Sequence, residues 1–210
     1  LTLARLLKEK TDAKICLGGN YIYKIAPDLK KIPAIFSEYC DFFIVGDGEI
    51  ASVELAEYIC GKRAINEVHS LVYADENGNV ITNETAPLLD MDNIYYPDYD
   101  CFDFDKYLAP EPVIPVQFGK GCYWSKCTFC DFYTGQQKFD MKSVSRAVDE
   151  VEFLVNKYGY RHFNFVDEAV PPAFYNAFAT ELIKRNLKIY YSSFVRLEKA
   201  FTAEILQNMY

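Results

Sequence analysis

Short apolar runs alternate with amphipathic stretches through the first part of the chain. The apolar runs are bounded by glycines, as buried strands are, and the amphipathic stretches carry apolar residues at helical spacing. This alternation of strand and helix predicts a parallel, doubly wound sheet of the flavodoxin-like kind. The predicted strands are residues 14–17 and 41–45, and the predicted helices are residues 1–10 and 50–60.

A β-hairpin and a linker follow. Residues 71–74 and 80–82 are apolar, and Asn77-Gly78 lies between them, which is a strong hairpin signal. Residues 87–113 are rich in Pro, Asp and Tyr and show no periodicity, so we expect an extended linker. The predicted first domain is therefore residues 1–86.

A second series of strands and helices fills residues 114–210, the predicted second domain. An amphipathic stretch that ends before Gly159 and a helix opened by Pro172 separate three apolar runs. Three such units leave open sheet edges, and we expect the chain to be a fragment of a longer protein. The alternative is a small, complete two-domain protein. The predicted strands are residues 115–118, 161–166 and 187–193, and the predicted helices are residues 142–158, 172–186 and a last one capped by Thr202.

The amino-acid composition limits the kinds of binding partner that we expect for the protein. The formal net charge is −8, from 30 acidic and 22 basic side chains, which argues against a nucleic-acid or anionic-membrane surface. We find neither a membrane-spanning run nor a signal peptide. Without a signal peptide we expect a cytoplasmic protein, whose seven cysteines are free thiols or metal ligands. Their odd number also disfavours a closed disulfide framework.

The candidate chemistry lies in one short loop. Cys122, Cys127 and Cys130 have the spacing C-x4-C-x2-C, directly after a predicted strand. Iron–sulfur clusters are held by cysteine thiolates, usually four. A cubane cluster held by three thiolates keeps one iron open, and an open position distinguishes a reactive metal site from a structural one.

This loop resembles the cluster-binding loop of radical S-adenosylmethionine (SAM) enzymes, which follows the first strand of a partial (βα) barrel. The resemblance implies a 4Fe-4S cluster on the three cysteines, with SAM chelating the open iron. It also implies reductive cleavage of SAM to a 5′-deoxyadenosyl radical, with electrons from a low-potential donor such as a flavodoxin or ferredoxin. Phe129 matches the family's aromatic position, where the backbone lies against the adenine. The family's commonest spacing has three residues between the first two cysteines, whereas this chain has four.

Further cofactor contacts are implied at later strand ends. In the resembling family the end of the second barrel strand contacts the SAM amino group, and Asp167 and Glu168 occupy that place. A solvated turn that caps the next helix is an equal alternative for these two. Ser192 and Arg196 follow the third strand, where the family binds SAM with polar residues. An arginine suits a carboxylate, although Arg196 has Glu198 as an alternative partner.

The first domain resembles the later part of a cobalamin-binding domain. Gly18-Gly19 follows one predicted strand, and residues 46–49 (Gly-Asp-Gly-Glu) follow the next. Glycines there allow close approach to a nucleotide-like tail, but tight strand-to-helix turns explain them without any ligand. Neither His69 nor His162 has the context of the family's cobalt-ligating histidine, so cobalamin is a possible cofactor only.

We therefore predict an α/β enzyme: a partial flavodoxin-like domain, a linker and the first units of a radical SAM barrel. Its substrate, a small molecule or a peptide, is not readable from the sequence. The alternative is a zinc-stabilised binding module without catalysis, in which Cys101 or His162 supplies a fourth ligand. A dithiol redox pair at Cys127 and Cys130 is a third reading, which leaves Cys122 unexplained.

Overall fold

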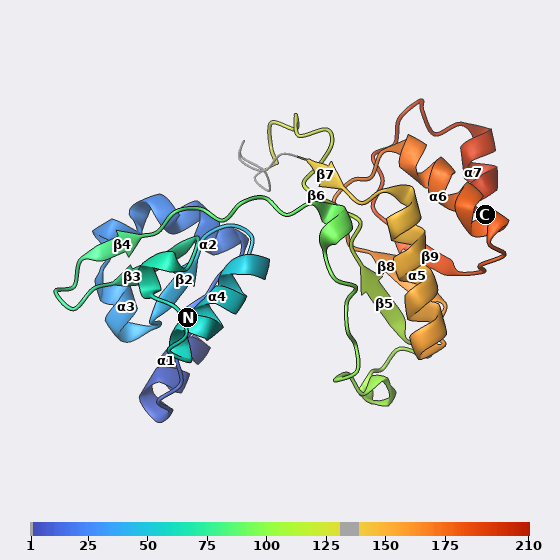
Figure 1. Cartoon of the computed structure of the whole chain (residues 1–210). Coiled ribbons are helices and arrows are strands. Elements are labelled where there is room, and N and C mark those ends of the chain that lie inside the picture. Colours follow the sequence, from blue (N-terminus) through green and yellow to red (C-terminus); the bar gives the residue numbers. More distant parts are fainter. Residues whose placement is uncertain (1, 131–138) are drawn as a thin grey trace. The chain divides into compact units, whose positions relative to one another are not determined.

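The computed structural model describes residues 2–130 and 139–210. The chain divides into two compact units, Leu1–Leu88 and Leu89–Tyr210. Figure 1 shows an α/β arrangement in each unit, which confirms the predicted fold class.

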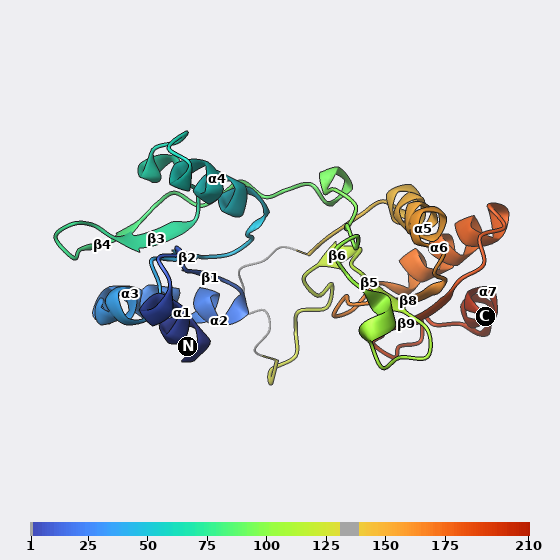
Figure 2. The same ribbon diagram turned by 90° about the horizontal axis from the view of Figure 1, so that it is seen from below.

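The N-terminal unit is built on a four-stranded sheet in the order β1-β2-β3-β4. β1 and β2 are parallel, whereas β2, β3 and β4 pair antiparallel, so only part of this sheet has the predicted parallel arrangement. Figure 2 shows α4 on one face of the sheet and α1, α2 and α3 on the other. The elements are β1 (Cys16–Leu17), β2 (Phe42–Ile44), β3 (Leu71–Ala74), β4 (Val80–Thr82), α1 (Thr2–Lys10), α2 (Asn20–Ile25), η1 (Ala26–Lys31), α3 (Ala34–Glu38), α4 (Glu49–Ile59) and η2 (Ile65–Glu67).

Strand alternation produces two cores in this unit. Phe43 packs with Leu29 and Phe36 on one face of the sheet. Its neighbours Phe42 and Ile44 pack with the α4 side on the other face. Both faces are thus buried, which explains why β2 reads as a continuous apolar run.

The C-terminal unit is built on a parallel sheet in the order β5-β8-β9. Figure 2 shows α5 and α6 on one face of this sheet. Ser143 caps α5 by accepting a hydrogen bond from the backbone of Arg146, and Gly159 ends it in the left-handed conformation with φ 77°. The elements are β5 (Val113–Val116), β8 (His162–Phe165), β9 (Tyr190–Ser193), α5 (Val144–Tyr158), α6 (Pro172–Lys184) and α7 (Ala203–Met209).

The segment that carries Cys122, Cys127 and Cys130 lies between the two strands of a small ladder. β6 (Gly119–Lys120) pairs antiparallel with β7 (Asp140–Met141), and the sequence pattern did not predict either strand. Each strand has only two residues, too few for an alternating pattern to be visible. The ladder brings both ends of the cysteine region together at the carboxyl end of β5.

The segment predicted as a linker packs on the C-terminal unit. It contains η3 (Met91–Asn93) and η4 (Phe104–Lys106), and Met91 is buried. The side chain of Arg146 on α5 donates to the carbonyl of Ile94 at 2.6 Å. Its guanidinium also lies 3.8 Å from the centroid of the Tyr96 ring. This segment, which lacks periodicity in the sequence, therefore makes contacts with the C-terminal unit.

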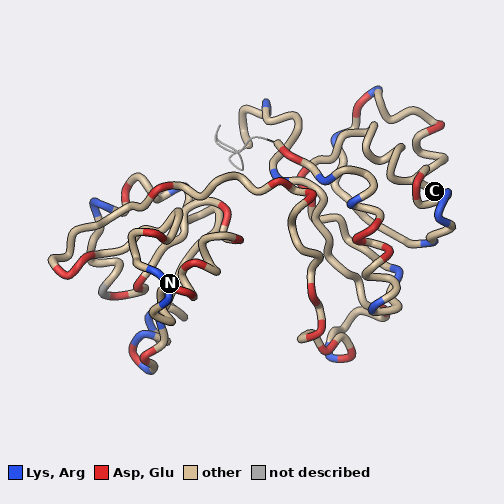
Figure 3. Tube along the Cα trace, in the orientation of Figure 1, with Lys and Arg blue, Asp and Glu red and all other residues tan. Residues whose placement is uncertain are grey.

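Charged residues are interspersed along both units (Figure 3). This distribution agrees with the absence of a Lys or Arg run in the sequence. Within the described ranges, no helix combines the length and apolar character needed to cross a bilayer.

Candidate functional site

Asp167 holds the base of the cysteine loop, which we define as residues 121–130. Its Oδ1 accepts hydrogen bonds from the backbone N–H groups of Phe118 at 3.0 Å and Gly119 at 2.5 Å. The residue is 1% exposed, so these bonds lie in a water-excluded place. A Cβ added to Gly119 would lie 3.1 Å from the Asp140 carbonyl and 3.4 Å from Asp167 Oδ1. Gly119 therefore permits a close approach of three chain segments.

The environment of Asp167 is electrostatically unfavourable for its charge. Burial raises the pKa of Asp167 to about 6, although the hydrogen bonds from Phe118 and Gly119 oppose this effect. The nearby carboxylate of Glu168 adds to the increase. The described hydrogen bonds of the Asp167 carboxylate come from the backbone that leads into the loop. Its predicted contact with SAM stays a prediction.

The cysteine loop itself is compact and its thiols are accessible. Cys122 is half-buried and Cys127 and Cys130 are exposed, all as free thiols. The backbone N–H of Cys130 donates to the carbonyl of Cys127 at 3.1 Å. Ser125 has a left-handed φ of 44°, and its hydroxyl donates to the Cys122 carbonyl. This turn accommodates the four residues between the first two cysteines.

Two aromatic residues of the loop contact the segment after β9. The Tyr123 hydroxyl donates to Glu198 Oε1 at 2.5 Å. Arg196 Nη1 donates to Glu198 Oε2 at 2.6 Å, and the Arg196 guanidinium lies 3.5 Å from the centroid of the Trp124 ring. Burial and the bond to Glu198 raise the pKa of Tyr123, so its hydroxyl stays a donor at neutral pH. The sequence suggested Glu198 as a partner of Arg196 but did not reveal either loop contact.

The other predicted cofactor residues lie nearby in the fold but differ in environment. Glu168 follows β8, and its Oε2 is buried without a hydrogen-bond partner among the described residues. Ser192 lies on β9 and donates to Asn164 Oδ1 on β8 at 2.9 Å. Phe129 is 88% exposed. Their roles in cofactor binding stay predictions.

Three thiols on one loop match the donor set of a cluster with an open iron. Among residues 2–130 and 139–210, no three Cys, His, Asp or Glu side chains converge as a metal site. The accessible thiols are nevertheless of the ligand type that iron–sulfur clusters need. The buried, unpaired oxygen of Glu168 is a second polar group suited to a cationic ligand.

Cys101 and His162, the two residues considered as a fourth zinc ligand, lie at the amino ends of the strands of the β5-β8-β9 sheet. His162 aligns with Val113 at the start of β5, and its ring pairs with Glu111 at 2.6 Å. Cys101 belongs to the segment that contacts Tyr158, at the end of α5 and before β8. The cysteine loop follows the opposite, carboxyl end of β5, as Figure 1 shows. Neither residue is therefore placed to close a site with the loop.

A buried ion pair near the base of the loop was not predicted from the sequence. Lys142 Nζ lies 2.5 Å from Glu150 Oε2 and donates to the Gln117 carbonyl at 2.8 Å. The two side chains are 4% and 1% exposed. Burial raises the pKa of Glu150, and Lys142 opposes this increase. Both residues lie in a predicted amphipathic helix region, where a charge normally indicates a solvated face.

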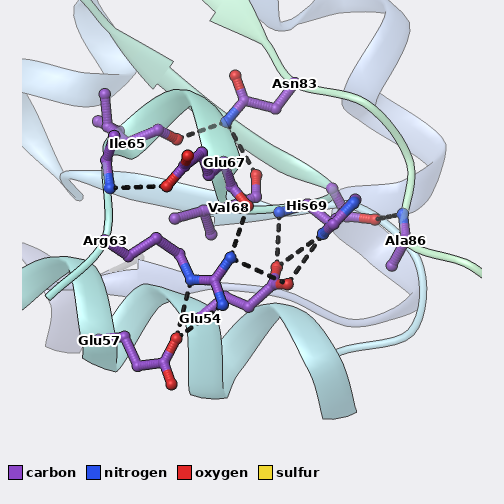
Figure 4. A network of polar contacts seen from close by, with 11 residues as sticks. Glu54, Glu57, Arg63, Ile65, Glu67, Val68, His69, Asn83 and Ala86 are labelled. Carbon is purple, nitrogen blue, oxygen red and sulfur yellow. Dashed lines mark hydrogen bonds and ion pairs between the residues drawn. The ribbon is translucent and has the colours of Figure 1, made fainter.

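The N-terminal unit has a polar network of its own (Figure 4). Glu54 on α4 accepts from the backbone N–H of His69 at 2.8 Å and lies 2.9 Å from its Nδ1. Arg63 Nη1 lies 3.6 Å from the same carboxylate. Burial alone would raise the pKa of Glu54, but His69 and Arg63 outweigh it and lower the pKa. His69, which the sequence left without a role, thus attaches α4 to the start of β3.

The glycine turns of this unit are open. Gly19 and Gly46 have φ values of 91° and 98°, which side chains rarely adopt. Among the described residues, nothing lies within 4 Å of a Cβ built on Gly19, Gly46 or Gly48. Gly19 and Gly46 therefore follow from turn conformation, and the space beside all three glycines is unfilled.

Known proteins with similar sequences are enzymes of which this chain covers a part. No protein-family model matches the chain. An uncharacterized methyltransferase of Pyrococcus horikoshii is 28% identical over 176 residues, covering 80% of this chain and 36% of the relative. An anaerobic magnesium-protoporphyrin IX monomethyl ester cyclase of Rubrivivax gelatinosus is 27% identical over 191 residues, covering 85% of this chain and 33% of the relative. The chain spans about a third of the length of these curated relatives.

Solved structures decide the fold family. The cobalamin-dependent SAM radical enzyme OxsB, with aqua-cobalamin bound, has a TM-score of 0.68 and 17% identity. The match covers 99% of this chain and 30% of that one. The chain has the fold of the cobalamin-dependent radical SAM enzymes. The radical SAM methyltransferase TsrM from Kitasatospora setae, with tryptophan and a SAM analogue bound, has a TM-score of 0.60 and 16% identity over 88% of this chain and 36% of its own. The fold that the resemblance implies is thereby confirmed.

Proposed function

We propose that this chain is the part of a radical SAM enzyme that holds the 4Fe-4S cluster and SAM. The observation that carries the proposal is the C-x4-C-x2-C loop at the carboxyl end of the first strand of a parallel sheet with this fold. Ligands bind at that end of parallel βα sheets. Cys122, Cys127 and Cys130 would be the cluster ligands, brought together as the loop closes on the metal.

When bound, the cluster supplies one electron that cleaves SAM to methionine and a 5′-deoxyadenosyl radical, which takes a hydrogen atom from the substrate. The chain's own residues bind, orient and shield these groups. Asp167 fixes the backbone that enters the loop. Glu168, whose buried oxygen lacks a partner among the described residues, would accept from the SAM amino group. Ser192, Arg196 and the backbone at Phe129 would complete the SAM contacts.

The proposal also covers the electron donor, the substrate and a second cofactor. The electron donor would be a low-potential protein such as a flavodoxin or ferredoxin. The relatives are methyltransferases, cyclases and a synthase, so their names leave the substrate, a small molecule or a peptide, unassigned. The open turns at Gly19 and Gly46 leave room for the nucleotide-like tail of cobalamin, which OxsB binds.

Anaerobic reconstitution with iron and sulfide tests the proposal. We expect about four irons and four sulfides per chain, and SAM cleavage under dithionite. Cys122→Ala, Cys127→Ala and Cys130→Ala should each lose the cluster, whereas Cys16→Ala, Cys60→Ala and Cys101→Ala should keep it. One tightly bound zinc per chain, no iron uptake and no SAM cleavage would support the zinc-stabilised binding module instead.

A further inference from the structure

We infer that Tyr123, Trp124, Arg196 and Glu198 form a clamp that fixes the position of the cysteine loop. In this loop clamp, Glu198 is a positioning residue that acts on the cluster through the loop, and Arg196 holds the loop in addition to its proposed contact with SAM. The inference rests on the proposed function for what the loop carries, but the clamp itself is defined by contacts of the described residues.

Glu198 lies at the centre of the clamp. Its two carboxylate oxygens accept from different sides: Oε1 from the Tyr123 hydroxyl at 2.5 Å, and Oε2 from Arg196 Nη1 at 2.6 Å. Tyr123 and Glu198 are 75 residues apart in sequence. The carboxylate therefore joins the loop after β5 to the segment after β9, across the whole width of the parallel sheet.

Arg196 makes a second contact with the loop at the same time. Its planar guanidinium donates to Glu198 at its edge, which leaves its face for stacking. That face lies 3.5 Å from the centroid of the Trp124 ring, within the range of a cation–π interaction. Lys126 Nζ lies 5.0 Å from the same ring. Two adjacent loop residues, Tyr123 and Trp124, are thus held by one ion pair.

The contacts inside the loop explain why a clamp is needed. The Cys130–Cys127 backbone bond and the Ser125–Cys122 bond shape the loop, but they join residues only three positions apart. Such local bonds do not attach the loop to the sheet. Tyr123 and Trp124 lie within the four-residue spacer between Cys122 and Cys127. The long spacer therefore gives the loop two aromatic side chains with which to reach the β9 segment.

Trp124 makes the clamp directly measurable, because the chain has one tryptophan. Acrylamide quenching of its fluorescence reports how well the clamp covers the ring, with or without a cluster. The variants are Glu198→Gln, which removes the charge that holds Arg196, and Arg196→Lys, which keeps the charge but loses the stacked plane. Glu152→Gln is the matched control, because Glu152 pairs with Arg185 Nη1 at 2.8 Å on the α5–α6 side.

We expect the Trp124 quenching constant to rise about twofold in Glu198→Gln and Arg196→Lys as the ring is uncovered. The control should equal the wild type. In reconstituted protein, the same two variants should bind as much iron as the wild type but release it to a chelator about threefold faster, since the loop opens more often. Circular dichroism should show unchanged helix content. Tyr123→Phe, which removes one hydrogen bond but keeps the ion pair between Arg196 and Glu198, should show a smaller change in the same direction.

The outcomes separate the clamp from the proposed function. Wild-type quenching in Glu198→Gln and Arg196→Lys would refute the clamp, whether or not iron binds. Increased quenching with wild-type iron release would refute its positioning role. A wild type that takes up no iron would refute both the proposed function and the positioning role, while the quenching series would still decide whether the clamp exists.

Discussion

The two units end their parallel strands in opposite ways. After β1 and β2 in the N-terminal unit, glycines with positive φ make turns that nothing crowds among the described residues. After β5 in the C-terminal unit, Gly119 is crowded by backbone and by Asp167, and Arg196 and Glu198 from the segment after β9 contact the cysteine loop. The first arrangement leaves space for a ligand, and the second fixes a loop that carries ligands of its own.

The difference teaches what a glycine at a strand end means. At Gly46 the backbone conformation requires glycine, and the neighbouring space is open. At Gly119 the close approach of Asp140 and Asp167 requires it. The sequence pattern is the same in both cases, and only the packing distinguishes them.

The largest expected effect comes from removing the acceptor at the loop base. Asp167→Ala leaves the buried N–H groups of Phe118 and Gly119 without their partner. We expect the C-terminal unit to lose about 2–4 kcal/mol of unfolding free energy, because each buried unsatisfied donor costs about 1–3 kcal/mol. Urea unfolding followed by Trp124 fluorescence measures this unit selectively. A loss below about 1 kcal/mol would contradict the role of Asp167 at the loop base.

The pH dependence of the unfolding free energy tests the ionisation of the Asp167 carboxyl group. The folded pKa of Asp167, about 6, lies above its unfolded value of about 3.9. The folded state then binds more protons between these values, so this group's contribution falls as pH rises from about 4 to 6. Asp167→Asn, which keeps an acceptor oxygen, should remove up to about 2 kcal/mol of that dependence. Urea midpoints at pH 4.5 and 7 for both proteins check this, and parallel pH profiles would contradict it.

A glycine pair sharpens the comparison of the two strand ends. Gly119→Ala places a methyl group about 3.1 Å from the Asp140 carbonyl, and we expect it to destabilise the C-terminal unit by about 1–3 kcal/mol. Gly48→Ala should change stability by less than about 0.5 kcal/mol, because its φ is −97° and nothing among the described residues lies within 4 Å of the new Cβ. Thermal unfolding measures both. Equal effects would mean that the two strand ends are packed alike.

Among the variants that remove a contact, the smallest expected effect lies in the N-terminal network. Glu54→Gln weakens the contacts to His69 and Arg63, and we expect a loss of about 1 kcal/mol at neutral pH. Because the folded pKa of Glu54 is lowered, its contribution is present at neutral pH and is lost as pH falls through that pKa. Hydrogen exchange of the α4 amides at pH 7 and pH 4 measures it. Exchange that differs between variant and wild type more at pH 4 than at pH 7 would contradict this sign.

Local sequence signals predicted most elements because their causes are local. Ser143 and Gly159 bound α5 as capping rules require, and Asn77-Gly78 joins β3 to β4. The loop clamp was not predictable, since Tyr123 and Glu198 meet only when the β5-β8-β9 sheet has formed. Asp167 was correctly placed at a strand end, but its hydrogen bonds with Phe118 and Gly119 were not predictable, since they also require that β5 and β8 have paired.

Electron paramagnetic resonance of the reconstituted, dithionite-reduced chain, recorded with and without SAM, tests the central claim most directly. A cluster held by Cys122, Cys127 and Cys130 alone has an iron that SAM can chelate, so SAM should change the g values of its signal. A reduced cluster whose signal is identical with and without SAM, or a chain that yields no cluster signal, would contradict the account.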